Sequence, residues 1–168
     1  MAAFDIQVIP ASIDQRPIIK QLLELYTYEM TDLVDFDIKG NGYFGYDELP
    51  LYWKESNRYP YLLYVNKKLA GFVLIQKGSP IEIDPEVWDV AEFFIMRKFR
   101  NKDVGQFVAQ QIWRSLKGRW QVRVWDNNKI AHAFWENVIA KFTSNSVIPT
   151  KREYQGHHGL LVYKFDSL

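Results

Sequence analysis

The sequence predicts a single mixed α/β domain with about seven strands and about four helices. Its 168 residues are enough for one hydrophobic core and too few for two comfortable domains. Hydrophobic residues make up 48% and charged residues 24%, which is typical of a globular chain and argues against long disordered segments. Runs of β-branched and aromatic residues alternate with stretches in which apolar residues recur at helical spacing, and this alternation gives the element count.

The N-terminal half predicts a strand, two helices and a β-hairpin. A β-prone run covers residues 4–9, and apolar side chains then recur at helical spacing over residues 18–30, behind a proline and two N-cap candidates. Residues 47–55 predict a second, shorter helix. Residues 59–65 and 69–76 predict two strands joined as a hairpin.

The C-terminal half predicts four strands and two amphipathic helices. The first of these strands is almost entirely apolar, as expected for a central strand covered on both faces, and Glu92 interrupts it. In chain order these elements cover residues 88–96 (strand), 104–116 (helix), 120–125 (strand), 130–139 (helix), 142–148 (strand) and 160–165 (strand).

Positive charge collects where the apolar strand gives way to the next helix. Four of the six residues at 97–102 are cationic, namely Arg97, Lys98, Arg100 and Lys102. The first turn of a helix has backbone N–H groups without partners, and the helix dipole places partial positive charge there. The pattern predicts a site for an anion such as a diphosphate. The alternative is a solvated basic loop without a ligand, which charge alone does not distinguish.

Two short motifs flank the predicted strand at residues 120–125. The first consists of Arg100, Asn101, Lys102, Asp103, Val104 and Gly105. The second includes Asn128, Ala131, Phe134 and Trp135. They resemble the Gln/Arg-x-x-Gly-x-Gly/Ala loop and the Asn-x-x-Ala-x-x-Phe-Tyr segment of the GNAT acetyltransferase superfamily. Asp103 stands at the first motif glycine, and Trp135 stands where many members have tyrosine.

The resemblance implies a fold and a reaction. The fold is a GNAT-like central sheet, mixed and mostly antiparallel, in one domain over residues 1–168. The reaction is transfer of an acetyl group from acetyl-CoA to a primary amine of a small molecule or peptide, by direct attack in a ternary complex. The alternative is a CoA-binding or interaction module with degraded catalysis, which the departures at Asp103 and Trp135 favour.

The resemblance also implies where acetyl-CoA, as co-substrate, would be held. Backbone groups of the apolar strand would contact the pantetheine arm, and the basic loop would hold the pyrophosphate. The implied cofactor-binding residues are Phe94, Ile95, Met96, Arg100, Asn101, Lys102, Asp103, Val104, Gly105, Asn128 and Trp135. Asp103 is expected to tolerate the positive φ that glycine favours, while its carboxylate would repel phosphate oxygens and the neighbouring cations would partly offset that repulsion.

Glu92 is the candidate general base, acting directly or through a water. With a strand period of two it shares a face with Val90, Phe94 and Met96, so apolar neighbours should raise its pKa toward the working range. The alternative is a structural carboxylate paired with Arg123 on the adjacent strand.

The sequence leaves the identity of the general acid and of the acceptor undetermined. Trp135 carries no proton of useful acidity, so the thiolate either leaves unassisted or takes a proton from water, Tyr46 or Tyr154. The loop at residues 35–46, with its aromatic and acidic side chains, would suit a cationic amine. The loop at residues 151–158, with Lys151, Arg152 and two histidines, would instead suit an acceptor that carries a carboxylate or phosphate.

Composition excludes several other classes. The chain has no cysteine, which excludes disulfides, thiolate metal sites and a covalent cysteine intermediate. The formal net charge of +1 argues against a nucleic-acid or membrane-surface partner. Residues 1–5 show no basic or apolar leader pattern, so a soluble cytoplasmic protein is the simplest expectation. The histidine pair at 157–158 is interpreted as surface imidazoles, no metal is expected, and exposed aromatics permit a homodimer without requiring one.

Overall fold

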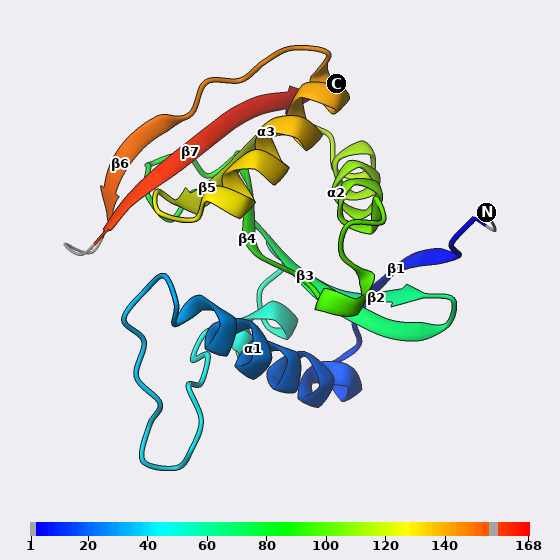
Figure 1. The fold of residues 1–168 in the computed structure, drawn as a ribbon, viewed down its shortest axis with the longest axis vertical. Coiled ribbons are helices and arrows are strands. Elements are labelled where there is room, and N and C mark those ends of the chain that lie inside the picture. The colour runs from blue at the N-terminus through cyan, green and yellow to red at the C-terminus, as the bar shows by residue number, and fades with distance from the viewer. Residues whose placement is uncertain (1–2, 155–157) are drawn as a thin grey trace.

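The computed structural model describes residues 3–154 and 158–168, which form a seven-stranded sheet with helices on both faces (Figure 1). The strand order is β1-β2-β3-β4-β5-β7-β6, and the neighbouring strands are antiparallel except β4 and β5, which are parallel. The strands are β1 (Ile6–Pro10), β2 (Arg58–Val65), β3 (Lys68–Lys77), β4 (Trp88–Ile95), β5 (Gly118–Trp125), β6 (Thr150–Tyr154) and β7 (His158–Ser167). The helices are α1 (Arg16–Met30), α2 (Val104–Ser115) and α3 (Lys129–Thr143), with 3-10 helices η1 (Ile13–Gln15), η2 (Leu49–Trp53) and η3 (Arg97–Phe99).

The two faces of the sheet carry separate hydrophobic clusters. Ile19 of α1 packs with Phe72 and Phe94 on one face. Ile112 of α2 and Ile139 of α3 belong to the larger cluster on the other face. Figure 1 shows α1 on one side of β4, and α2 and α3 on the other. Within the residues that the structure describes, no helix combines the length and hydrophobicity needed to cross a membrane.

The predicted fold class and the order of its elements are confirmed, but the second predicted helix is a short 3-10 helix. Leu49 and Tyr52 are both buried, at 4% and 3% exposed. They are three residues apart, so a helix with three residues per turn places both side chains on the same buried side.

The predicted strand at residues 142–148 is wrong. Helix α3 continues to Thr143, and the strand that follows is β6. Phe142 extends the apolar stripe of the helix and packs against Trp113 and Phe165, with ring centroids 5.2 and 6.4 Å away. The apolar residues at helical spacing therefore extend to Phe142, beyond the predicted end of the helix at residue 139.

The parallel pair β4 and β5 separates part-way along its length. In the described structure the ladder pairs Trp88 with Trp120, Asp89 with Gln121, and Val90 with Val122. Beyond these pairs, β4 continues to Ile95 and β5 continues to Trp125. One edge of β4 is thereby left open toward the space between the two strands.

A β-bulge lies in β4 at the point of separation. Leu74 of β3 pairs with Glu92, and the next residue, Ile75, pairs with Val90. Ala91 is thus an extra residue in the ladder. A bulge bends the strand and increases its local twist, which fits the divergence of β4 from β5 at this point.

The bulge changes which side chains share a face. Val90 packs in the cluster under α2 and α3, and Phe93 takes that side after the bulge. Phe94 packs in the cluster under α1. Glu92 contacts Tyr46, which also packs on the α1 side. The prediction that Glu92 shares a face with Val90 is therefore wrong, because strict alternation stops at the extra residue, whereas its shared face with Phe94 holds.

A buried carboxylate joins three strands at the base of the separation. Asp89 is 0% exposed and accepts hydrogen bonds from Gln76 on β3 at 3.0 Å and from Gln121 on β5 at 2.7 Å. Arg123 of β5 donates two more from Nε and Nη2, both at 2.8 Å. These four charge-assisted bonds hold the paired ends of β4 and β5 together.

We expect Asp89→Ala to lower the free energy of unfolding by about 3–5 kcal/mol, because it removes the buried carboxylate that accepts hydrogen bonds from Gln76, Gln121 and Arg123. Urea unfolding at pH 7 measures the change. Arg119→Ala is the control, since it breaks the exposed bond to Asp84 and should cost less than about 1 kcal/mol. Equal losses in the two variants would contradict the prediction.

Candidate active site

A cleft of about 770 Å³ opens where β4 and β5 separate. Helix α1 and the loop at residues 33–46 form one wall, and α3 with the start of β7 forms the other. Aromatic and acidic side chains make up much of the lining. The cleft is lined by Leu23, Tyr26, Thr27, Met30, Val34, Asp35, Phe36, Asp37, Phe44, Gly45, Tyr46, Val90, Ala91, Glu92, Phe93, Val122, Arg123, Val124, Trp125, Asn128, Ala131, Trp135 and Leu160.

Glu92 projects into this cleft from the bulged segment of β4. Its Oε1 accepts a hydrogen bond from the Tyr46 phenol at 3.1 Å. Burial raises the pKa of Glu92 from 4.5 to about 7, while the positive charge of Arg123 and hydrogen bonds from Tyr26 and Tyr46 act in the opposite direction. The net result is a carboxylate that changes charge near neutral pH.

The salt-bridge partner of Arg123 is Asp89 and not Glu92, which was the alternative considered from the sequence. Its guanidinium faces the Asp89 carboxylate in a two-bond arrangement. Its charge still lowers the pKa of Glu92, but the desolvation of Glu92 is the larger effect. The geometry therefore favours the interpretation of Glu92 as a group poised for proton transfer.

The backbone of β4 offers hydrogen-bonding groups along its open edge. The Met96 N–H donates to Ala70 O on β3 at 2.8 Å. In an antiparallel ladder, alternate residues point to opposite edges, so Phe94 also faces β3, whereas Phe93 and Ile95 face the gap. Of the three strand residues predicted to meet the cofactor through their backbones, Ile95 faces the open edge, and Phe93 joins it.

The basic loop contains two residues with a left-handed backbone conformation. Asn101 and Asp103 both have φ of 58°, and Asp103 is the left-handed N-cap of α2. Asparagine and aspartate tolerate this region better than most residues, so the glycine-like geometry is kept. Val104 is 1% exposed and anchors the helix in the core. Asp103, in contrast, is exposed, with its carboxylate at the helix N-terminus.

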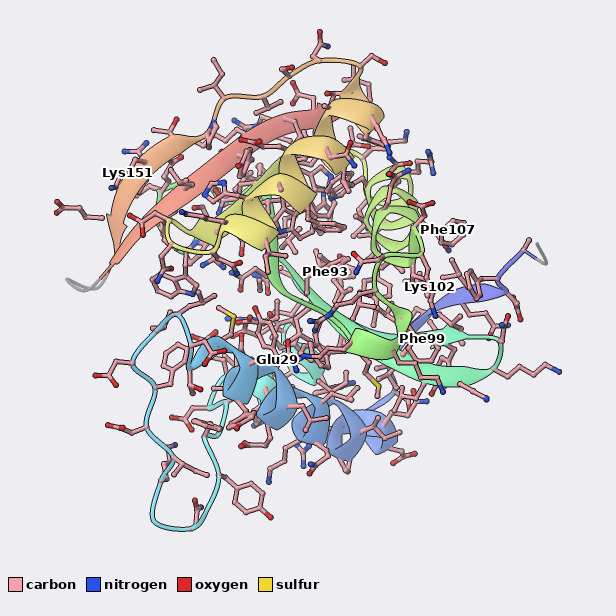
Figure 2. The ribbon with its side chains drawn as sticks, viewed as in Figure 1. Glu29, Phe93, Phe99, Lys102, Phe107 and Lys151 are labelled. Atoms are coloured by element: carbon pink, nitrogen blue, oxygen red, sulfur yellow. The ribbon has the colours of Figure 1, made fainter. Side chains whose placement is uncertain are left out.

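Two cations of this loop are held by α1. Glu29 accepts from Arg97 at 2.9 Å and from Arg100 at 2.7 Å, and Arg100 also donates to Ile95 O at 2.6 Å. The Lys102 Nζ donates to the backbone of the same loop, at Lys98 O. Figure 2 shows Glu29 on α1 facing the segment of Phe99, with Lys102 at the base of α2. The loop is therefore basic but internally braced.

The second motif lies on α3 against the cleft. Asn128 caps the helix by accepting from the Ala131 N–H at 3.1 Å, and it also lines the cleft. Trp135 is 6% exposed, and its ring lies 4.9 Å from that of Phe93 between the separated strands. Gly105 has no side chain to clash with Phe134, which a Cβ would meet at 3.0 Å, so α2 and α3 approach closely.

The structure brings Glu92, Asn128, Trp135 and Tyr46 into one cleft, whereas the predicted cofactor-binding residues 94–96 and 100–105 do not line it. His157 and the side chains of Tyr154 and His158 lie outside the described residues. Sequence reasoning missed Asp89 as the anchor of Arg123, although a charged residue in an apolar strand was a usable signal.

A family model described as the acetyltransferase (GNAT) family matches residues 21–138. The chain belongs to the GNAT acetyltransferase family. A search of curated proteins found no match. The fold of this GNAT domain is similar to that of an acetyltransferase from Thermus thermophilus, with a TM-score of 0.67, 15% identity and 96% of each chain covered.

Two further solved structures resemble this GNAT chain. The ribosomal-protein-S18-alanine N-acetyltransferase from Escherichia coli has a TM-score of 0.65 and 10% identity, covering 96% of this chain and 94% of its own. RimL, a ribosomal L7/L12 alpha-N-protein acetyltransferase in complex with coenzyme A, has a TM-score of 0.63 and 14% identity, covering 96% and 93%. At these identities the similarity shows the fold alone. Within residues 3–154 and 158–168, no group of three or more His, Asp or Glu side chains is arranged for a metal ion.

We expect Glu92→Gln to stabilise the folded chain at pH 8 and to do so much less at pH 5. The pKa of Glu92 is raised on folding, so its contribution to stability is lost as pH rises from about 4.5 through about 7. The gain at pH 8 should reach up to roughly 3 kcal/mol, measured by urea unfolding at both values.

Glu82→Gln is the matched control for this effect. Lys164 and Arg152 hold the pKa of Glu82 below its ordinary value, so its removal should lower stability at pH 8. If both glutamine variants changed stability in the same direction at pH 8, the assignment of a raised pKa to Glu92 would be refuted.

Proposed function

We propose that this GNAT protein is an N-acetyltransferase that moves the acetyl group of acetyl-CoA to a primary amine by direct attack in a ternary complex. The observation that carries the proposal is Glu92, a carboxylate with a pKa near 7 in the cleft between β4 and β5. A general base is most effective when its pKa lies close to the working pH. The lack of any cysteine removes the usual covalent carrier, which supports direct transfer.

The residues present fit acetyl-CoA, which would supply the activated acetyl thioester. The open edge of β4 has the backbone groups of Phe93 and the N–H of Ile95, which suit an extended amide-containing arm, while the Ile95 carbonyl accepts from Arg100. The N-terminus of α2 and the cations at Lys98 and Lys102 suit a pyrophosphate.

The chemical role of Glu92 follows from its position. When an amine nitrogen becomes an amide nitrogen it loses a proton, and Glu92 would accept that proton in its ionised form. The same carboxylate would attract the positive charge that develops on nitrogen during attack. The hydrogen bond from Tyr46 fixes the carboxylate orientation within the cleft.

The charges of the cleft favour an acceptor that carries positive charge. Asp35 and Asp37 line the cleft together with Glu92, among the rings of Phe36 and Phe44. Carboxylates and aromatic faces both attract an ammonium group. A small amine with a second cationic group, such as an aliphatic diamine, fits this lining.

The basic residues considered for an anionic acceptor are engaged elsewhere. Lys151 pairs with Asp126 at 3.1 Å, and Arg152 pairs with Glu82 at 2.9 Å. Neither cation lines the cleft. Figure 2 shows Lys151 on β6, at the outer edge of the sheet. An acceptor that carries a carboxylate is therefore the weaker fit.

A CoA-binding module without efficient catalysis is the second candidate. Two observations favour it: Asp103 places a carboxylate at the N-terminus of α2, and Glu29 holds Arg97 and Arg100. Both reduce the positive potential that a pyrophosphate would meet. A weaker pyrophosphate site lowers cofactor affinity in either candidate, so turnover is the measurement that distinguishes them.

We expect Asp103→Asn to bind acetyl-CoA several-fold more tightly than the native chain, because a charge repulsion of about 1 kcal/mol is removed at nearly constant side-chain volume. Calorimetric titration of acetyl-CoA and free CoA measures the affinities. Asn101→Gly is the control, since it relieves the other positive φ in the loop without changing charge. Tighter binding by the control alone would show that backbone strain and not charge limits affinity.

We expect Glu92→Gln to lower kcat by about 10²–10⁴-fold with a diamine acceptor and to leave the Kd for acetyl-CoA unchanged. In the native enzyme, kcat/KM should rise with pH and level off above about 7, because the base must be ionised. Steady-state assays from pH 5 to pH 9 test both points. Acetyl-CoA binding without turnover of any amine would favour the second candidate, and unchanged turnover in Glu92→Gln would remove Glu92 from the mechanism.

A further inference from the structure

The cleft lacks a proton donor at the position where the family resemblance would place one. Trp135 occupies that place on α3, is nearly fully buried and lines the cleft. Its indole N–H is not acidic enough to protonate a thiolate. If the proposed acetyl transfer takes place, the leaving thiolate needs a donor from another element or from solvent.

Tyr46 enters the same cleft from the opposite wall. Its phenol donates to Glu92 Oε1 at 3.1 Å, so this hydroxyl group is one hydrogen bond away from the proposed base. Both residues line the cleft, and Tyr46 packs on the α1 side, where Glu92 also lies.

The backbone around Tyr46 is fixed by α1. Glu24 accepts from the N–H groups of Phe44 at 2.8 Å and Gly45 at 2.9 Å, which are the two residues before Tyr46. Gly45 has φ of 79°, a conformation that side chains oppose. On the other side, Tyr46 O accepts from the Leu49 N–H at 3.1 Å. The phenol is therefore placed by a braced turn and not by a free loop.

We propose that Tyr46 is the general acid of this enzyme and that it works as a relay with Glu92, an inference that rests on the proposed acetyl transfer. The acceptor enters as a neutral amine, and its nitrogen forms the C–N bond as the C–S bond breaks. Glu92 takes the proton that nitrogen loses, and Tyr46 gives its phenol proton to the sulfur. Protonated Glu92 then returns a proton to Tyr46, so the products are the amide and the free thiol, and both side chains are restored.

The electrostatics of the pair support this order of events. Burial, and then the negative charge of Glu92, raise the pKa of Tyr46 far above its ordinary value. Once Glu92 has taken up a proton, that charge is gone and the phenol becomes a better donor. Tyr46 thus holds its proton in the resting enzyme and releases it after the base has acted.

Tyr26 provides a matched control. It also donates a hydrogen bond that stabilises ionised Glu92, and it lines the same cleft. Its ring packs against Phe72 and Phe94, with centroids 6.0 and 5.8 Å away, so it packs against the hydrophobic cluster under α1. Tyr26→Phe removes a bond to Glu92 without removing the proposed proton donor.

The test compares Tyr46→Phe and Tyr26→Phe with two acetyl donors, acetyl-CoA and S-acetyl-4-nitrothiophenol, whose thiolate leaves without needing a proton. Tyr46→Phe should lower kcat/KM with acetyl-CoA by about 10²-fold and leave the rate with the aryl thioester within about threefold of the native enzyme. Tyr26→Phe should give the same native-to-variant ratio with both donors. An equal defect of Tyr46→Phe with both donors would assign it only a positioning role and overturn the inference, as would no defect at all.

Two further measurements keep the outcomes separate. Calorimetric binding of acetyl-CoA to each variant tests whether the cofactor site is intact. The second measurement is the rate of an enzyme with 3,5-difluorotyrosine at position 46, which keeps both the ring and a hydroxyl group that can donate a proton. The difluorotyrosine enzyme should retain the acetyl-CoA rate within about tenfold, and a loss as large as that of Tyr46→Phe would overturn the inference. A native enzyme that turns over neither thioester refutes the proposed function itself, whereas normal native turnover with an unaffected Tyr46→Phe refutes only the role of Tyr46.

Discussion

The separation of β4 from β5 is the constraint on which the rest of this structure depends. Three residue pairs hold the strands together, and the buried Asp89 carboxylate joins them through Arg123 and Gln121. Beyond these pairs, β4 remains paired with β3 and β5 remains paired with β7, so the sheet opens between β4 and β5. A parallel pair that opens in this way exposes a backbone edge inside the molecule instead of at its rim. The cleft, its lining and its hydrogen-bonding edge all follow from this one divergence.

The bulge at Ala91 decides the chemistry of the cleft. One extra residue moves Glu92 to the α1 face, where two phenols and the charge of Arg123 surround it. Without the bulge, strict alternation would place that carboxylate among the apolar residues under α2 and α3. The one extra residue therefore decides the environment of Glu92. With the bulge, the carboxylate accepts hydrogen bonds and has a pKa near 7, whereas without it the carboxylate would be buried among apolar side chains.

Helix α1 links the two ends of the site. Glu24 braces the turn that presents Tyr46, and Glu29, five residues further on, holds Arg97 and Arg100 at the basic loop. Cofactor affinity and the placement of the cleft phenol are therefore tied to the same helix. The bonds of Glu29 also draw positive charge toward α1 and away from the N-terminus of α2, where Asp103 lies.

The local periodicity of the sequence determined the mixed fold, the order of its strands and helices, and the two motifs, because each of these depends on neighbours within a few residues. Glu92 stood out for the same reason, as a carboxylate in an apolar strand. The extent of α3 through Phe142, the 3-10 turn at η2 and the bulge at Ala91 depend on what packs against them from distant parts of the chain. The partnership of Glu92 with Tyr46, 46 residues away in the sequence, was decided by tertiary structure alone, since no periodicity records which loop reaches an open strand edge.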